Sequence, residues 1–144
     1  MIRALSEIEA VPVDDCACAT CREMCRRPCW PTPAEAVALM DRGLSKRLMC
    51  DWWEADEELP HTKILCGASS GRGGKSAPNN PIGAYCSFLS ADGRCELHGN
   101  GKPIEGRKAT CKGNNPDLHV SIAAAWNTDE GRAAVIRFWR EVKP

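Results

Sequence analysis

Apolar residues recur at helical spacing from residue 32 onward. Residues 32–35 match a capping box, in which the Thr32 hydroxyl accepts from the N–H of Glu35 and the Glu35 side chain reaches back. Gly43 is expected to end this helix. Ser45 then predicts the start of a second helix, so that helices occupy about residues 33–55. The inward-facing apolar positions of the two helices are Val37, Met40, Leu44, Leu48 and Trp52.

The end of the chain shows the same helical pattern. Asp117 is a candidate cap for one helix, and Thr128 or Asp129 is a candidate cap for the next. These signals predict two helices within about residues 117–142. Their apolar positions are Leu118, Ile122, Trp126, Val135, Phe138, Trp139 and Val142.

Residues 60–116 lack this periodicity and predict a loop-rich region. Gly, Ser, Asn and Pro dominate from Gly67 to Gly83. Short apolar pieces at 64–65 and 85–89 are candidate strands, and Asp92-Gly93 is a turn signal that predicts a hairpin between residues 88–89 and 95–97. A loop region this long is unusual in a compact domain unless something holds it in place.

Together these patterns predict one small domain over residues 1–144. The fold class is mainly α, with long irregular loops and a small β-hairpin, and we expect bound metal to stabilise it. A chain of this length usually forms one domain and can bury a real core without disulfides.

Composition narrows the function classes. Lys+Arg and Asp+Glu both number 19, so the net charge indicates no nucleic-acid partner. The longest apolar stretch, Ile122 to Trp126, is too short to span a bilayer, and residues 1–9 lack the apolar core of a secretory signal. We therefore expect a cytoplasmic protein with no membrane partner. The composition identifies no protein partner.

Ten cysteines change this picture, since five of them lie within residues 16–29. Thiols stay reduced in the cytoplasm, where a high density of cysteine favours metal binding over disulfides. Cys18 and Cys21 have the spacing of a metal knuckle. Cys21, Cys25 and Cys29 are each four residues apart, which would place three sulfurs on one helix face.

A second group of cysteines is embedded in the loop-rich region, where ligation would hold the loops in place. His98, which forms a C-x2-H pair with Cys95, is a weaker candidate ligand, and whether Cys16 joins the ligand set is left open. Cys50 is expected to be a packed core thiol. The predicted metal ligands are Cys18, Cys21, Cys25, Cys29, Cys66, Cys86, Cys95 and Cys111.

The metal could be zinc or iron, including iron in an iron–sulfur cluster. Structural zinc takes four Cys or Cys/His ligands. The ferredoxin spacing for a cubane cluster is C-x2-C-x2-C-x3-C-P, whereas Cys18 to Cys29 has x2, x3 and x3 between its cysteines. Eight sulfurs would suffice for two four-ligand sites or one polynuclear site.

Three parts of the chain resemble the YkgJ-type family of zinc- or iron-chelating cysteine-cluster proteins. They are Cys18 to Cys25 with the following proline and helix, Cys86 through His98, and Lys102-Pro103 leading to Cys111-Lys112. The family is named for the motif C-x2-C-x2-C-C, and this chain has no adjacent pair of cysteines. Cys25 and Cys29 would then serve as ligands in place of that pair. The resemblance covers about residues 16–112 and implies a metal-chelating domain.

The leading hypothesis is a metal-binding protein whose metal is mainly structural or chelated. One alternative is an iron–sulfur redox or methyl-transfer accessory enzyme, and another is a disulfide-stapled interaction protein. The sequence shows no Ser/His/Asp order, paired catalytic carboxylates or HExxH helix, so we assign no catalytic residue and lean against an enzyme.

Overall fold

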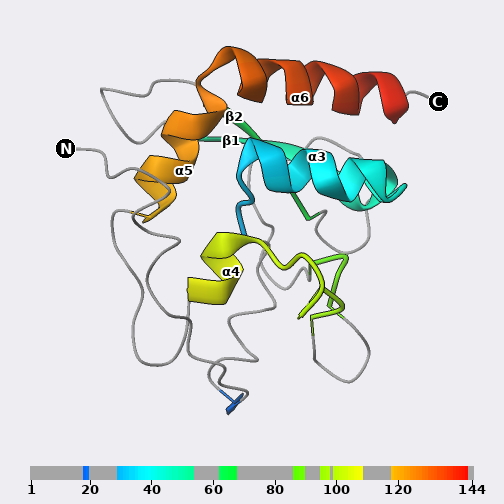
Figure 1. The fold of residues 1–144 in the computed structure, drawn as a ribbon, viewed down its shortest axis with the longest axis vertical. Coiled ribbons are helices and arrows are strands. Elements are labelled where there is room, and N and C mark those ends of the chain that lie inside the picture. The colour runs from blue at the N-terminus through cyan, green and yellow to red at the C-terminus, as the bar shows by residue number, and fades with distance from the viewer. Residues whose placement is uncertain are drawn as a thin grey trace.

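The computed structural model describes residues 18–19, 29–53, 62–67, 86–89, 95–97, 99–108 and 118–142. Over these residues the chain forms mainly helices with one small antiparallel sheet (Figure 1). The elements are α3 (Pro33–Asp41), η1 (Ser45–Arg47), β1 (Leu48–Trp53), β2 (Thr62–Gly67), α4 (Ile104–Lys108), α5 (Leu118–Trp126) and α6 (Asp129–Glu141).

The capping signals for α3 and α6 are confirmed. The Thr32 hydroxyl accepts from the N–H of Glu35 at 3.2 Å, and the Glu35 carboxylate accepts from the N–H of Thr32 at 2.9 Å. Gly43 lies just beyond the end of α3 with φ of +79°, a left-handed conformation that glycine adopts without steric cost. At α6 the Thr128 hydroxyl accepts from the N–H of Gly131 at 3.1 Å.

The predicted second helix from Ser45 to about Ala55 is wrong. Ser45 begins only one 3₁₀ turn, and its hydroxyl donates to Glu141 at 2.7 Å instead of capping a helix. The chain then becomes extended at Leu48 and forms β1, which pairs antiparallel with β2. Four consecutive residues, Leu48 to Asp51, are buried. Continuous burial suits a strand covered on both faces, whereas a surface helix would expose one side.

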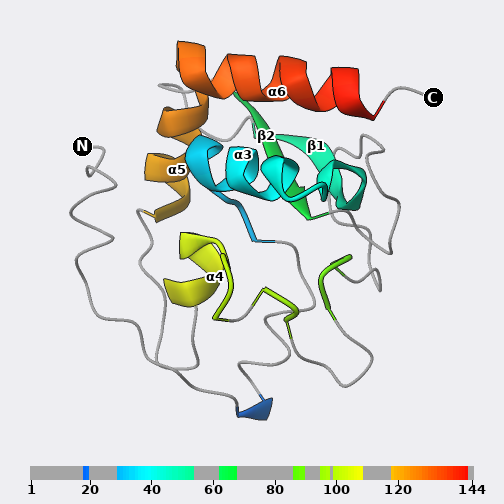
Figure 2. The ribbon, with the colours of Figure 1, turned by 45° about the vertical axis from the view of Figure 1, so that its right-hand side comes forward.

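The sheet lies at the centre of the described fold. β2 packs against both α5 and α6, and α3 packs against α6. Figures 1 and 2 show α6 along one side of the molecule, α3 next to it, and α4 on the side away from α6. The core residues that join these elements are Leu39, Leu48, Ile64, Leu65, Ile122, Trp126 and Phe138.

The predicted pairing across Asp92-Gly93 is confirmed where the structure describes it. Leu89 and Cys95 form an isolated antiparallel bridge, and the N–H of Glu96 donates to the carbonyl of Phe88 at 2.8 Å. The loop-rich region also contains structure that the sequence did not predict, namely α4 and most of β2. Within the described part of the chain, no helix combines the length and apolar character that crossing a membrane requires.

Candidate metal centre

Four of the eight predicted ligands, Cys29, Cys66, Cys86 and Cys95, are linked by electrostatic interactions, although the described residues include no group arranged to hold a metal ion. The charges of Cys86 and Cys95 both act on Cys29, and those of Cys29 and Cys86 act on Cys66. Three separate parts of the chain supply these thiols: the segment before α3, the strand β2, and the bridged pair at 86–89 and 95–97. Cys29, at the end of the N-terminal cysteine segment, therefore lies within electrostatic range of cysteines from β2 and from the loop-rich region.

Hydrogen bonds from distant helices fix the position of Cys29. The next residue, Trp30, donates its backbone N–H to the Glu105 carboxylate of α4 at 3.0 Å. The carbonyl of Pro31 accepts from the indole N–H of Trp126 at 2.7 Å. Because these bonds involve main-chain groups one and two residues after Cys29, they hold this segment between α4 and α5.

The sheet holds Cys66. This residue pairs with Met49 of β1 in the antiparallel register, and both side chains are about 1% exposed. Trp30 packs against this pair. Cys66 is thus placed by a strand ladder, which gives its backbone little freedom to move.

Arg47 organises the segments that carry Cys86 and Cys95. Its guanidinium lies over the Phe88 ring, 4.5 Å from the centroid, and pairs with the Glu96 carboxylate at 2.7 Å. It also donates to the carbonyl of Ser87, whose hydroxyl donates back to the Arg47 carbonyl. The contacts of one side chain therefore reach both bridged segments.

Two glycines leave room for sulfur. A Cβ atom at Gly67 would lie 2.6 Å from the Cys86 sulfur, and one at Gly106 would lie 2.9 Å from the Cys29 sulfur. Both distances are shorter than a carbon–sulfur contact tolerates, so any larger residue would displace a thiol. The backbones of β2 and α4 form a close-fitting cradle for these two sulfurs.

Burial and neighbouring negative charges favour the protonated form of Cys29. Burial raises the pKa of the Cys29 thiol well above its ordinary value of 9.0. The charges of Glu105, Cys86 and Cys95 raise this pKa further, while Lys102 lowers it. Neighbouring negative groups therefore disfavour a thiolate at Cys29, and a bound cation would reverse that effect.

Cys66 behaves in the same way. Burial is the largest cause that raises its pKa, and the charge of Asp51 comes next, followed by smaller contributions from Cys29, Cys86 and Glu105. Cys29 and Cys66 are both free thiols. Their donor atoms are the soft sulfurs that zinc and iron–sulfur clusters take as ligands.

Of the other predicted ligands, the structure describes Cys18. Cys18 is exposed, in a two-residue piece that lies beyond α4 (Figures 1 and 2). Cys21, Cys25 and Cys111 lie outside the described residues, as do Cys16 and His98. Among the residues that the structure describes, no group of three or more His, Cys, Asp or Glu is arranged to hold a metal ion.

Cys50 is a buried core residue, as predicted, although it lies on β1 and not on a helix. Burial raises the pKa of its thiol to about 11, with a smaller rise from Asp51 and a lowering by Lys63. It provides a useful reference cysteine because it belongs to the main apolar core.

Sequence reasoning did not identify Glu105, Arg47, Gly67 and Gly106 as part of this region. Their partners are distant in sequence: Glu105 and Trp30 are 75 residues apart, and Arg47 and Ser87 are 40 apart. A glycine next to a candidate ligand, as in Cys66-Gly67, was the one local signal available.

Comparisons with protein-family models, curated proteins and solved structures found no significant match. The resemblance to the cysteine-cluster family stays a prediction that rests on the quoted motifs.

Proposed function

We propose that this protein binds zinc or iron through clustered cysteine thiolates and that the metal is mainly structural or chelated. The observation that supports the proposal is that the Cys29 thiol interacts electrostatically with Cys66, Cys86 and Cys95, which come from other parts of the chain. Cysteine can supply the fourfold thiolate set that structural zinc or an iron–sulfur cluster requires. The remaining predicted ligands, Cys18, Cys21, Cys25 and Cys111, would complete this site or form a second one.

The cradle at Gly67 and Gly106 supports the proposal. A methyl group added at Gly67 or Gly106 would press on the Cys86 or Cys29 sulfur, so the positions of these two sulfurs are closely set by the packing around them. Metal binding would also offset the mutual repulsion of thiolates in a buried cluster that includes Glu105. Bound metal would therefore contribute to folding, on the order of 10 kcal/mol for a structural zinc ion.

The test is a zinc titration of reduced, metal-free protein against a chelator of known affinity. Wild type is expected to bind zinc stoichiometrically, and Cys66→Ser should lose most of that affinity. Cys50→Ala is the matched control, since it also removes a buried cysteine of the sheet but should keep zinc affinity. Equal affinity in Cys66→Ser and Cys50→Ala would refute the assignment of Cys66.

The same titration can be made on Gly67→Ala, a variant that retains all ten cysteines. Its Cβ would displace the Cys86 sulfur, so zinc affinity should fall while the number of titratable thiols stays unchanged. Gly99→Ala is the control, since it also introduces a Cβ at a glycine but no atom lies within 4 Å of that position. The one expected cost is the backbone strain of an alanine at a φ of +73°. Loss of zinc affinity in both variants would point to general destabilisation.

A further inference from the structure

One stripe of α6 faces away from the rest of the described fold. Figures 1 and 2 show the other helices and both strands on one side of this helix. Asp129, Ala133, Ile136 and Arg140 are all exposed, and they follow one another at steps of four, three and four residues. This spacing places them within roughly 60° of each other around the helix axis. Alternating steps of three and four residues are the spacing by which one helix packs along another.

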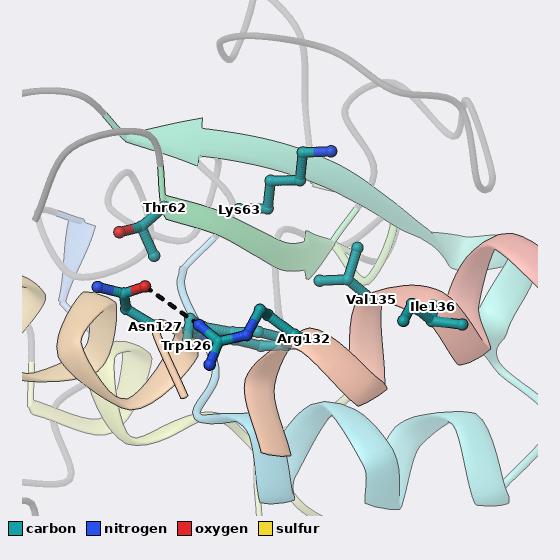
Figure 3. Close-up of a pocket in the computed structure, with 7 residues that line it drawn as sticks. All are labelled: Thr62, Lys63, Trp126, Asn127, Arg132, Val135 and Ile136. Atoms are coloured by element: carbon teal, nitrogen blue, oxygen red, sulfur yellow. Dashed lines mark hydrogen bonds between the residues drawn. The ribbon is translucent and has the colours of Figure 1, made fainter. Parts of the chain in front are cut away.

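The centre of the stripe is apolar. Ile136 is 54% exposed, which makes it the exposed large hydrophobic residue of the described chain. It lies at the edge of a hollow beside β2, and Figure 3 shows the Arg132 side chain turned toward Asn127 and away from Ile136. Ala133, one turn earlier, carries a single methyl group. A second helix packed along this stripe would remove Ile136 from water.

Opposite charges flank the apolar centre symmetrically. Asp129 and Arg140 share one midpoint with Ala133 and Ile136, between residues 134 and 135. An antiparallel copy of α6 centred on this point would place each Asp129 opposite the Arg140 of the other copy. Each Ala133 would face the Ile136 of the other copy, so a small side chain would meet a large one. A parallel copy would bring like charges together at both ends, which is unfavourable.

The contacts of the two charged residues within the chain leave room for this pairing. Asp129 pairs with Arg132 at 2.9 Å, but the Asp129 side chain is fully exposed, and exposed pairs of this kind are weak. A carboxylate has two oxygens, so Asp129 can accept from a second guanidinium as well. Arg140 has no ion-pair partner among the residues that the structure describes.

We propose that two copies of this chain associate through α6, with the two helices antiparallel about a twofold axis. In such an interface the same surface of each copy contacts the other, so every residue pair occurs twice. α6 has 13 residues and is about 20 Å long, which makes the contact short and the dimer weak. No cysteine belongs to the stripe, so the proposal does not depend on the candidate metal centre.

Sedimentation equilibrium of the full chain, kept reduced, tests the apolar centre. The average mass of the wild type should rise from monomer toward dimer between about 10 µM and about 1 mM, the range of a weak interface. Ile136→Asp places a charge in the seam and should stay monomeric throughout. Ala38→Asp, which changes an exposed alanine of α3, is the control and should associate like the wild type. A monomeric wild type at about 1 mM, or equal association of Ile136→Asp, would overturn the proposal.

Two charge reversals test the antiparallel pairing. Asp129→Arg and Arg140→Asp should each weaken self-association by at least about tenfold, because both symmetry-related contacts then join like charges. An equimolar mixture of the two variants should associate like the wild type, since every contact in the mixed dimer joins opposite charges. A mixture that associates no better than its separate components would overturn this pairing. Ile136→Asp and Arg140→Asp decide the question by themselves if Asp129→Arg lowers the helical circular dichroism.

Discussion

The carboxylate of Glu35 accepts the backbone N–H of Ile104 at 2.9 Å, across 69 residues of sequence. Its other oxygen accepts from Thr32 at the start of α3. One side chain therefore satisfies N–H groups at the beginnings of two helices, α3 and α4. Since Glu105 of α4 holds Trp30, this link extends from α3 through α4 to the segment that carries Cys29.

Glu35→Gln tests this link. An amide has one acceptor oxygen where the carboxylate has two, so one of the two backbone N–H groups loses its partner. We expect the free energy of unfolding to fall by about 1–2 kcal/mol, measured by urea denaturation. Glu130→Gln changes an exposed carboxylate in the first turn of α6 and should cost about 0.5 kcal/mol or less. Equal losses in the two variants would contradict the role given to Glu35.

Arg47→Lys tests whether Arg47 positions Cys86 and Cys95. Lysine keeps the positive charge but lacks the planar fork that stacks on Phe88 and bonds both neighbouring segments. Zinc affinity should fall by about tenfold, because groups that orient ligands typically matter by 10–100-fold. Arg140→Lys is the control on exposed α6, with no change expected. Unaltered zinc affinity in Arg47→Lys would show that the bridged pair holds its shape without it.

Metal binding should depend steeply on pH. The raised pKa values of Cys29 and Cys66 mean that both are protonated near neutral pH, so a metal must displace at least two protons. Apparent zinc affinity should therefore rise by at least about 100-fold per pH unit between pH 6 and 8, and fall equally toward acid. Competition titrations at several pH values measure this slope. A slope below tenfold per unit would mean that the metal does not displace these two protons.

The raised pKa of the Cys50 thiol predicts that the protein loses stability at alkaline pH. Its thiol has a pKa of about 11 when folded and 9.0 ordinarily, so the unfolded chain loses this proton first as pH rises. Its contribution is intact below pH 9 and is lost toward pH 11, at up to about 1.4 kcal/mol per unit. Wild type should lose more stability than Cys50→Ala over this range, in urea denaturation of the metal-free proteins. Parallel losses would contradict the shift.

Local signals predicted part of the fold well. Thr32 and Glu35 are three residues apart, and Thr128 caps a helix with a clear apolar face, so both starts could be found from neighbouring residues. The strand at Leu48 to Trp53 could not, because its structure depends on pairing with β2. Leu48 and Trp52 fit helical spacing as well as a strand, and tertiary pairing decides between the two.

The sequence suggested which side chains would bind a metal, but it did not suggest which residues hold those side chains in position. The density of cysteines in the sequence predicted a shared metal site, and that assignment stays a prediction. The residues that position the cysteines were not predicted. The first N–H of α4, that of Ile104, donates to Glu35, and Arg47 donates to the carbonyl of Ser87, 40 residues away. Such partners come together only when the chain folds, so no local pattern shows them.

Metal analysis of protein purified anaerobically tests the central claim most directly. The account predicts at least one zinc or iron per chain, retained through purification and released, with loss of structure, by a strong chelator. Visible colour together with iron would favour a cluster over zinc. Protein that contains no metal, whose ten cysteines titrate as free thiols and whose structure is unchanged by added zinc, would contradict it.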